Sequence, residues 1–230
     1  MSDFEGFGKG FFDFFRELAK HNERPWFEAN KDRYKETVVA PCLAFITAMA
    51  PRLEKISQHY VADPRPNGGS MFRIYRDVRF AKDKRPYKEH AAMQFRHHRG
   101  RDAHAPGFYV HLEPGRVFLG GGIWRPPSPD LALIRARIAK DPAGWSKVVG
   151  DKTLKKVAGG IRGDALKRPP KGFTGEEKHI EDIKRQSFFA MAEMDEKVAG
   201  SAKFLDRAEA GFKAATPLMR FLCKAVDVPF

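Results

Sequence analysis

Residues 107–124 read Gly-Phe-Tyr-Val-His-Leu-Glu-Pro-Gly-Arg-Val-Phe-Leu-Gly-Gly-Gly-Ile-Trp, and this stretch decides the fold class. From 108 to 113, apolar side chains take the even positions, and Tyr109, His111 and Glu113 take the odd positions. This alternation gives a strand with one apolar and one polar face. A second strand is expected at 116–124. Pro114-Gly115 between them predicts an antiparallel hairpin, with a loop of two or more residues.

The same reasoning extends to both sides of the hairpin. Further strands are expected at 60–62, 71–75, 90–98 and 187–194, and helices at 7–21, 25–38, 41–57, from Ser128, from Asp141-Pro142 and over 201–226. Ser128 is expected to cap its helix, and Pro217 to break the last one. This order predicts an α+β fold: a mostly antiparallel sheet of about five or six strands, packed with N-terminal and C-terminal helices. We expect one domain over 1–230, in which the region from about 159 could form a C-terminal helical annex.

The composition excludes several classes of protein. The 230 residues contain 42% hydrophobic and 31% charged residues, which excludes a disordered chain. No run of about 18 apolar residues predicts a membrane helix, and the first residues lack a signal-peptide pattern. The two cysteines, Cys42 and Cys223, are too few for a disulfide scaffold. We therefore expect a cytoplasmic protein that does not contact membranes.

Positive charge is concentrated in one segment. The chain carries 42 Lys and Arg against 29 Asp and Glu, a balance of +13. Between Arg73 and Arg101 there are ten basic and three acidic residues, so 10 − 3 = +7 of that surplus lies in an eighth of the chain. Arginine side chains bind phosphate and carboxylate groups in a bidentate manner. The segment therefore predicts an anion site, although Arg-Asp pairs equally build structural ion-pair networks.

The residues expected to bind a ligand come from this segment and from the hairpin. They are Arg73, Arg76, Asp77, Arg79, Asp83, Lys84 and Tyr87, together with Tyr109 and His111. The arginines and the lysine would hold the anion, and the aspartates would orient them. Tyr87, Tyr109 and His111 would shape the pocket or transfer protons. No catalytic residue is assigned.

A long motif resembles that of a known family. Residues 72–80, Phe-Arg-Ile-Tyr-Arg-Asp-Val-Arg-Phe, are followed by Asp-Lys-Arg-Pro-Tyr-Lys at 83–88. Together with stretches at 22–31, 105–109 and 120–126, this motif is similar to DUF2461, a bacterial family of uncharacterised proteins. The resemblance spans nearly the whole chain and implies a soluble protein of unknown function. It marks Arg73, Arg76, Asp77, Arg79, Phe80, Asp83, Lys84 and Tyr87 for attention, and implies no reaction or cofactor.

Histidines cluster between residues 90 and 111 without the spacing of a metal site. Five of the eight histidines lie there: His90, His97, His98, His104 and His111. Adjacent histidines at 97 and 98 are expected on opposite faces of a strand. No His-Glu-x-x-His motif occurs. The sequence therefore predicts no metal site and no cofactor.

Three functions remain open. The first is a pocket for a small anionic ligand, phosphorylated or carboxylated, with or without catalysis. The second is a non-enzymatic nucleic-acid-binding domain that uses the same basic segment, since aromatic residues are interleaved with its cations. The third is a scaffold or partner-binding protein in which the arginines bind internal aspartates and backbone carbonyls. The sequence fixes neither the ligand nor the oligomeric state.

Overall fold

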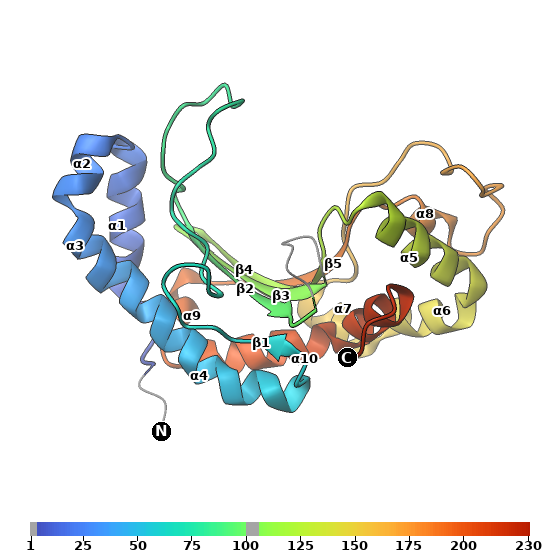
Figure 1. Cartoon of the computed structure of the whole chain (residues 1–230). Helices are drawn as coiled ribbons and strands as arrows, with labels where there is room; N and C mark the ends of the chain where they lie inside the picture. Colours follow the sequence, from blue (N-terminus) through green and yellow to red (C-terminus); the bar gives the residue numbers. More distant parts are fainter. Residues whose placement is uncertain (1–3, 100–105) are drawn as a thin grey trace.

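Five strands form one antiparallel sheet in the order β1-β2-β3-β4-β5 in the computed structural model, which describes residues 4–99 and 106–230 (Figure 1). The strands are β1 (Tyr60–Val61), β2 (Ala91–His97), β3 (Gly107–Glu113), β4 (Arg116–Ile123) and β5 (Phe188–Met194). Strands β3 and β4 form the expected hairpin, in which Glu113 pairs with Arg116 across the two-residue loop. Gly115 has a φ of 75°, a value that favours glycine. The α+β prediction is confirmed.

Helices lie before the sheet, between β4 and β5, and after β5. The N-terminal group is α1 (Lys9–Lys20), α2 (Arg24–Ala29), α3 (Lys31–Tyr34), the π-helix η1 (Lys35–Val39) and α4 (Ala40–Ile56). The others are α5 (Ser128–Lys140), α6 (Pro142–Gly150), α7 (Lys152–Ala158), α8 (Ile180–Ile183), α9 (Glu196–Ala199) and α10 (Lys203–Ala225). In Figure 1, α1–α3 rise at one side of the sheet and α5, α6 and α8 lie at the other, while α7 lies beside α10.

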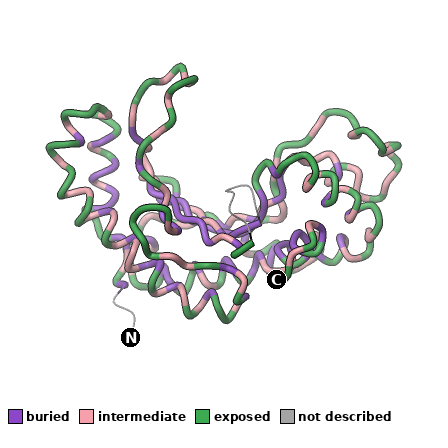
Figure 2. Tube along the Cα trace, viewed as in Figure 1, coloured by how far each residue is buried: buried purple, intermediate pink, exposed green. Residues whose placement is uncertain are grey.

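Helix α10 covers one face of the sheet. The ring of Phe212 packs against Phe95 of β2 and Phe108 of β3, at centroid distances of 5.6 and 4.8 Å. Helix α10 approaches β4 closely, because a Cβ atom at Gly211 would lie 2.3 Å from Cδ1 of Leu119. Figure 2 shows burial concentrated in the strands and the inner turns of α1 and α10. This packing leaves the opposite sheet face available for a site.

Two hydrophobic clusters share α10. The larger joins the sheet to α1, α4 and α10, and includes Phe212 and Met219. The smaller joins the ends of β4 and β5 to α5–α8, and includes Leu218 and Leu222 of the same helix. Adjacent residues of α10 therefore belong to different clusters.

The helical run Lys31–Ile56 has the length and composition of a membrane span, with a mean hydropathy of 1.2 in its most apolar window. Its apolar side chains are used in the larger cluster, where Cys42, Phe45 and Met49 are fully buried. Core helices of this kind pass the same length and composition test as membrane spans.

Three local expectations differ from the structure. Residues 71–75 are not a strand: Met71 bridges to Met93, after which the chain leaves the sheet and Tyr75 pairs with Tyr87. Pro217 lies inside a continuous α10, because the buried residues around it hold both halves in the core. Ser128 begins α5 without a side-chain cap, since Pro127 takes the cap position.

Candidate functional site

The open face of the sheet carries a hollow of about 690 Å³. Strand alternation places its side chains, because odd positions of β3 and β5 and even positions of β4 point away from α10. Its aromatic and apolar walls are Phe72, Tyr109, Phe118, Trp124, Phe189 and Met191. The size and the apolar lining are those of a small-molecule site.

A chain of polar side chains runs along β3: Tyr109 and His111 line this hollow, and Glu113 lies beyond them. The hydroxyl of Tyr109 lies 3.3 Å from Nδ1 of His111, and Nε2 of His111 lies 3.0 Å from Oε2 of Glu113. A carboxylate accepts only, so Nε2 carries the proton and Nδ1 accepts from the tyrosine. The sequence predicts these three side chains on one face of one strand, and the structure brings them into hydrogen-bond contact.

The imidazole of His111 is enclosed by rings. It stacks on Phe118 at a centroid distance of 4.5 Å and an interplanar angle of 13°, and lies 4.3 Å from the ring of His90. Burial lowers the pKa of His111, and burial with the neighbouring His111 lowers the pKa of His90 to about 4. Burial raises the pKa of Tyr109 to about 12. All three groups are therefore neutral at pH 7.

Three cations without acidic partners lie beside Phe72 at the edge of the large hollow, although none of them lines it. The Nζ of Lys88 and the Cζ of Arg96 lie 5.8 and 5.7 Å from the ring centre of Phe72. Lys88 donates to the carbonyl of Arg73 at 2.6 Å, and burial followed by the charge of Arg73 lowers its pKa. Within residues 4–99 and 106–230, none of these three cations has a carboxylate within 4.0 Å. This edge therefore carries uncompensated positive charge.

A smaller hollow of about 170 Å³ adjoins the first through His90. Arg76 pairs with Asp83 at 2.8 Å, and Arg85 pairs with the same carboxylate at 2.8 Å. Arg85 also pairs with Glu89 at 2.5 Å. The acidic partners offset the arginines here, whereas Lys88, which also lines this hollow, has no carboxylate partner among the described residues.

The end of the basic segment lies outside both hollows. Asp77 pairs with Arg79 at 2.7 Å, and this guanidinium lowers the pKa of Asp77 to about 2. Lys84 donates to the carbonyl of Val78 at 3.0 Å. Phe80 is 95% exposed, with the guanidinium of Arg79 5.8 Å from its ring centre. Figure 1 shows this segment standing away from the sheet.

Tyr87 anchors the segment and does not line the large hollow. It is 2% exposed and stacks on Phe27 of α2 at 4.2 Å. The amide of Asn22 accepts from the Tyr87 N–H and donates to its carbonyl, both at 3.0 Å, and donates to Glu89 at 2.9 Å. The base of the segment is thus held by the N-terminal helices.

Residues 10–221 match the family described as conserved hypothetical protein DUF2461. The chain belongs to this family. The match covers most of the 230 residues and confirms the resemblance carried by the motif at 72–88. No curated protein matches the chain.

Only part of the DUF2461 motif therefore lies at the large hollow. Of the expected site residues, Tyr109 and His111 line the large hollow. Arg76, Asp83 and Tyr87 line the small one, and Arg73 lies at the cationic edge. Asp77, Arg79 and Lys84 lie away from both. Arg101 and His104, counted in the basic segment and the histidine cluster, lie outside the described residues.

Sequence reasoning did not single out the walls contributed by β4 and β5. Phe118 and Phe189 come from strands 65 residues apart in sequence, and pairing of Gly122 with Phe189 brings those strands together. The available signal was strand alternation, which puts Phe118 on the face opposite Leu119. Alternation does not say which of the two faces remains uncovered.

Proposed function

We propose that this protein binds a small anionic ligand in the large hollow. The observation that carries the proposal is the partly buried ammonium of Lys88, whose hydrogen-bond partner is a carbonyl. Lys88 lines the adjoining small hollow, and its Nζ lies 5.8 Å from the ring centre of Phe72 in the wall of the large one. A partly buried charge without a counter-charge is unfavourable, and a ligand phosphate or carboxylate would supply one. Arg73 and Arg96 lie at the same edge and would share that anion.

The walls favour a ligand with a flat apolar part. Phe72, Phe118 and Phe189 offer aromatic surfaces, and Met191 offers a polarisable one. Aromatic rings and thioethers pack well against planar groups. An aromatic or heteroaromatic phosphate or carboxylate combines the two required features.

The chain on β3 is suited to proton transfer, so we extend the proposal to catalysis. Tyr109 would take a proton from the ligand as its own hydroxyl proton passes to Nδ1 of His111. The resulting imidazolium would be stabilised by Glu113, which already accepts from Nε2. Glu113 also fixes the tautomer that leaves Nδ1 ready to accept.

Two variants test this site, each of which replaces one lysine with glutamine and so removes one positive charge. Lys88→Gln removes a cation that lines the small hollow and lies beside Phe72 of the large one, while Lys84→Gln removes a cation of the same segment outside both hollows. Calorimetric titration with adenosine monophosphate, phenyl phosphate and benzoate identifies the ligand class. We expect Lys88→Gln to weaken the affinity for the tightest-binding of these ligands at least tenfold. Lys84→Gln should change that affinity less than twofold. Equal losses in both variants would contradict a pocket and indicate general attraction to positive charge.

Nucleic acid is the second candidate, favoured by one observation. Phe80 is 95% exposed at the end of a basic segment, where a base could stack on it while Arg79, Lys82 and Lys84 contact phosphates. Fluorescence anisotropy with a single-stranded oligonucleotide tests this. Binding that falls on the order of 10³-fold between 50 and 200 mM salt and is weakened by Phe80→Ala would support it. Binding unaffected by Phe80→Ala would contradict it.

We also propose a cytoplasmic location without membrane contact. The burial of Cys42, Phe45 and Met49 in the core supports it, because these side chains belong to the most membrane-like helical run of the described residues. Cell fractionation of the native host tests it: recovery in the membrane pellet that resists a salt wash would contradict the proposal.

A further inference from the structure

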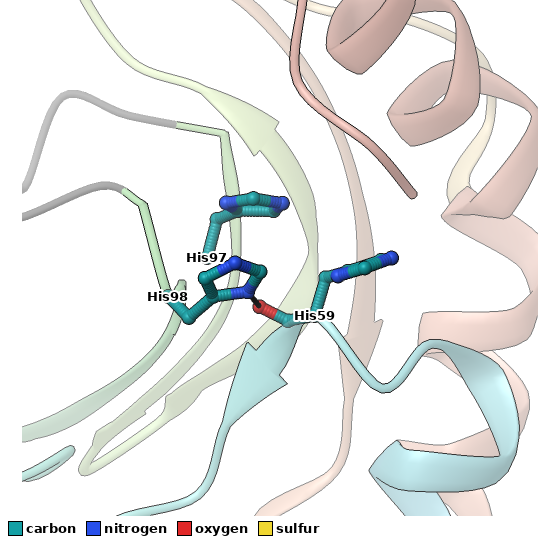
Figure 3. Close-up of side chains that lie close together, drawn as sticks. All are labelled: His59, His97 and His98. Carbon is teal, nitrogen blue, oxygen red and sulfur yellow. Dashed lines mark hydrogen bonds between the residues drawn. The ribbon is translucent and has the colours of Figure 1, made fainter.

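Three histidines gather at the edge of the sheet where β1 meets the end of β2 (Figure 3). His97 is the last residue of β2, His98 follows it, and His59 precedes β1. Pairing of Tyr60 with His97 brings the two segments together, and the His98 N–H donates to the His59 carbonyl at 2.8 Å. One ring nitrogen of each histidine lies within 4.8 Å of the others. His98 joins its neighbour because it lies beyond the strand, where alternation no longer applies.

Hydrogen bonds leave two of these rings with a nitrogen suited to a metal. Nε2 of His97 donates to the carbonyl of Pro229 at 2.9 Å, and Nδ1 of His98 donates to the carbonyl of His59 at 3.2 Å. Metal-binding histidines generally donate their other N–H in this way, which fixes the tautomer and orients the ring. Nδ1 of His97 and Nε2 of His98 then carry lone pairs. Nδ1 of His97 accepts from the Arg99 N–H at 3.1 Å, a bond that a metal ion would displace.

The spacing of the rings fits a single ion. The ring centres are 4.7 Å apart for His97 and His98, 5.2 Å for His59 and His98, and 5.7 Å for His59 and His97. A tetrahedral ion with bonds of about 2.0–2.1 Å to imidazole nitrogens places neighbouring ring centres about 5 Å apart. The rings lie nearly parallel, with interplanar angles of 24°, 36° and 25° for the same pairs, so the side chains would rotate to direct their lone pairs at one ion.

We propose that His59, His97 and His98 bind a divalent transition-metal ion of the zinc class. Imidazole ligands favour Zn²⁺, Co²⁺, Ni²⁺ and Cu²⁺, whereas Mg²⁺ and Ca²⁺ require oxygen ligands. His98 is exposed and His59 partly exposed, so solvent can reach the ion and water supplies the fourth ligand. This proposal replaces the sequence-based expectation of no metal site and is independent of the large hollow.

The ion would join three parts of the chain. His59 leads into β1, His97 ends β2, and His97 also holds Pro229. Phe230 packs on Tyr60 at a centroid distance of 5.7 Å. A metal that binds only the folded chain raises its stability, so the role proposed is to fasten these segments together.

The test uses tag-free protein, since a histidine tag would itself bind the metal. After treatment with a chelator, the protein is titrated with Zn²⁺ by calorimetry and with Co²⁺ by visible absorption, which is intense for tetrahedral sites. We expect one ion per chain, and at least tenfold weaker binding for both His59→Ala and His98→Ala. His21→Ala is the matched control, because His21 is exposed, stacks on Trp26 and lies far in sequence from the three proposed ligands.

Circular dichroism without metal shows whether each variant is folded. His98→Ala is the decisive variant, since its exposed ring contributes little to the core. Zn²⁺ should raise the melting temperature of the parent chain and of His21→Ala, but not of folded His98→Ala. Absence of saturable binding, or equal affinity in His98→Ala and His21→Ala, would overturn the proposal.

Discussion

Nε2 of His111 lies 3.0 Å from Oε2 of Glu113, two residues further along β3. The pair sits on the same strand face as Tyr109, so a single strand supplies a donor, a base and the group that orients it. Because the strand fixes the spacing, the arrangement does not depend on ligand binding. It can be examined without knowing the ligand.

Substitutions of two residues near His111 are expected to shift its pKa in opposite directions. Burial lowers this pKa, the hydrogen bond and charge of Glu113 raise it, and the charge of Arg116 lowers it. Glu113→Gln should therefore lower the pKa further, and Arg116→Gln should raise it. An NMR pH titration of the imidazole measures both. Shifts in the same direction would mean that the contact with Glu113 does not form in solution.

Acid should destabilise the protein through His90. Burial and the nearby His111 lower the folded-state pKa of His90 to about 4, from an ordinary value of 6.5. The neutral form is favoured in the folded state, so its stabilising effect is present above pH 6.5 and is lost as the pH falls toward 4. Urea denaturation at several pH values should show the free energy of unfolding declining across this window. His90→Gln should flatten that decline, and an unchanged slope would contradict the assignment.

Gly120→Ala should destabilise the sheet. A Cβ atom there would lie 1.9 Å from the carbonyl oxygen of Ala190 on β5, so the β4-β5 pairing would have to open. We expect a loss of about 1–3 kcal/mol or more in the free energy of unfolding. Gly150→Ala, with no atom within 4 Å of its added Cβ, is the control, and should be neutral or stabilise by about 0.4–1 kcal/mol. Similar effects of the two substitutions in thermal denaturation would contradict this packing.

Asn22→Ala should loosen the base of the basic segment. It removes three hydrogen bonds, two to the backbone of Tyr87 and one to Glu89. Leaving partly buried backbone groups unpaired costs about 1–3 kcal/mol. Hydrogen exchange should show faster exchange of the Tyr87 amide in the variant, while the amides of β3 stay protected. Uniformly faster exchange across the sheet would instead indicate global destabilisation.

Sequence patterns predicted the hairpin well because the residues that determine it are close together in the sequence. Alternation from 108 to 113 and the turn at Pro114-Gly115 fixed two strands, their pairing and the face shared by Tyr109 and His111. The start of α6 near Asp141-Pro142 was equally readable, and the structure adds that Asp141 caps this helix by accepting from the Gly144 N–H. Each of these features depends on residues a few positions apart.

The remaining parts of the site depend on contacts between distant segments. Charge counting could not show that Asp83 pairs with Arg76 while Lys88 lacks such a partner within the described ranges. Nor could it show that His59 meets His97, 38 residues away in sequence, because the pairing of Tyr60 with His97 brings them together. Residues 71–75 alternate as a strand would, but only Met71 of this run pairs with β2.

The sharing of α10 between the two hydrophobic clusters has a consequence for biosynthesis. A nascent chain whose last emerged residue precedes Lys203 lacks Phe212 and Met219 for one cluster and Leu218 and Leu222 for the other. The part of the sheet face that packs against Phe212 then lacks that cover. We therefore expect both clusters to be completed only once residues up to Ala225 have left the ribosome.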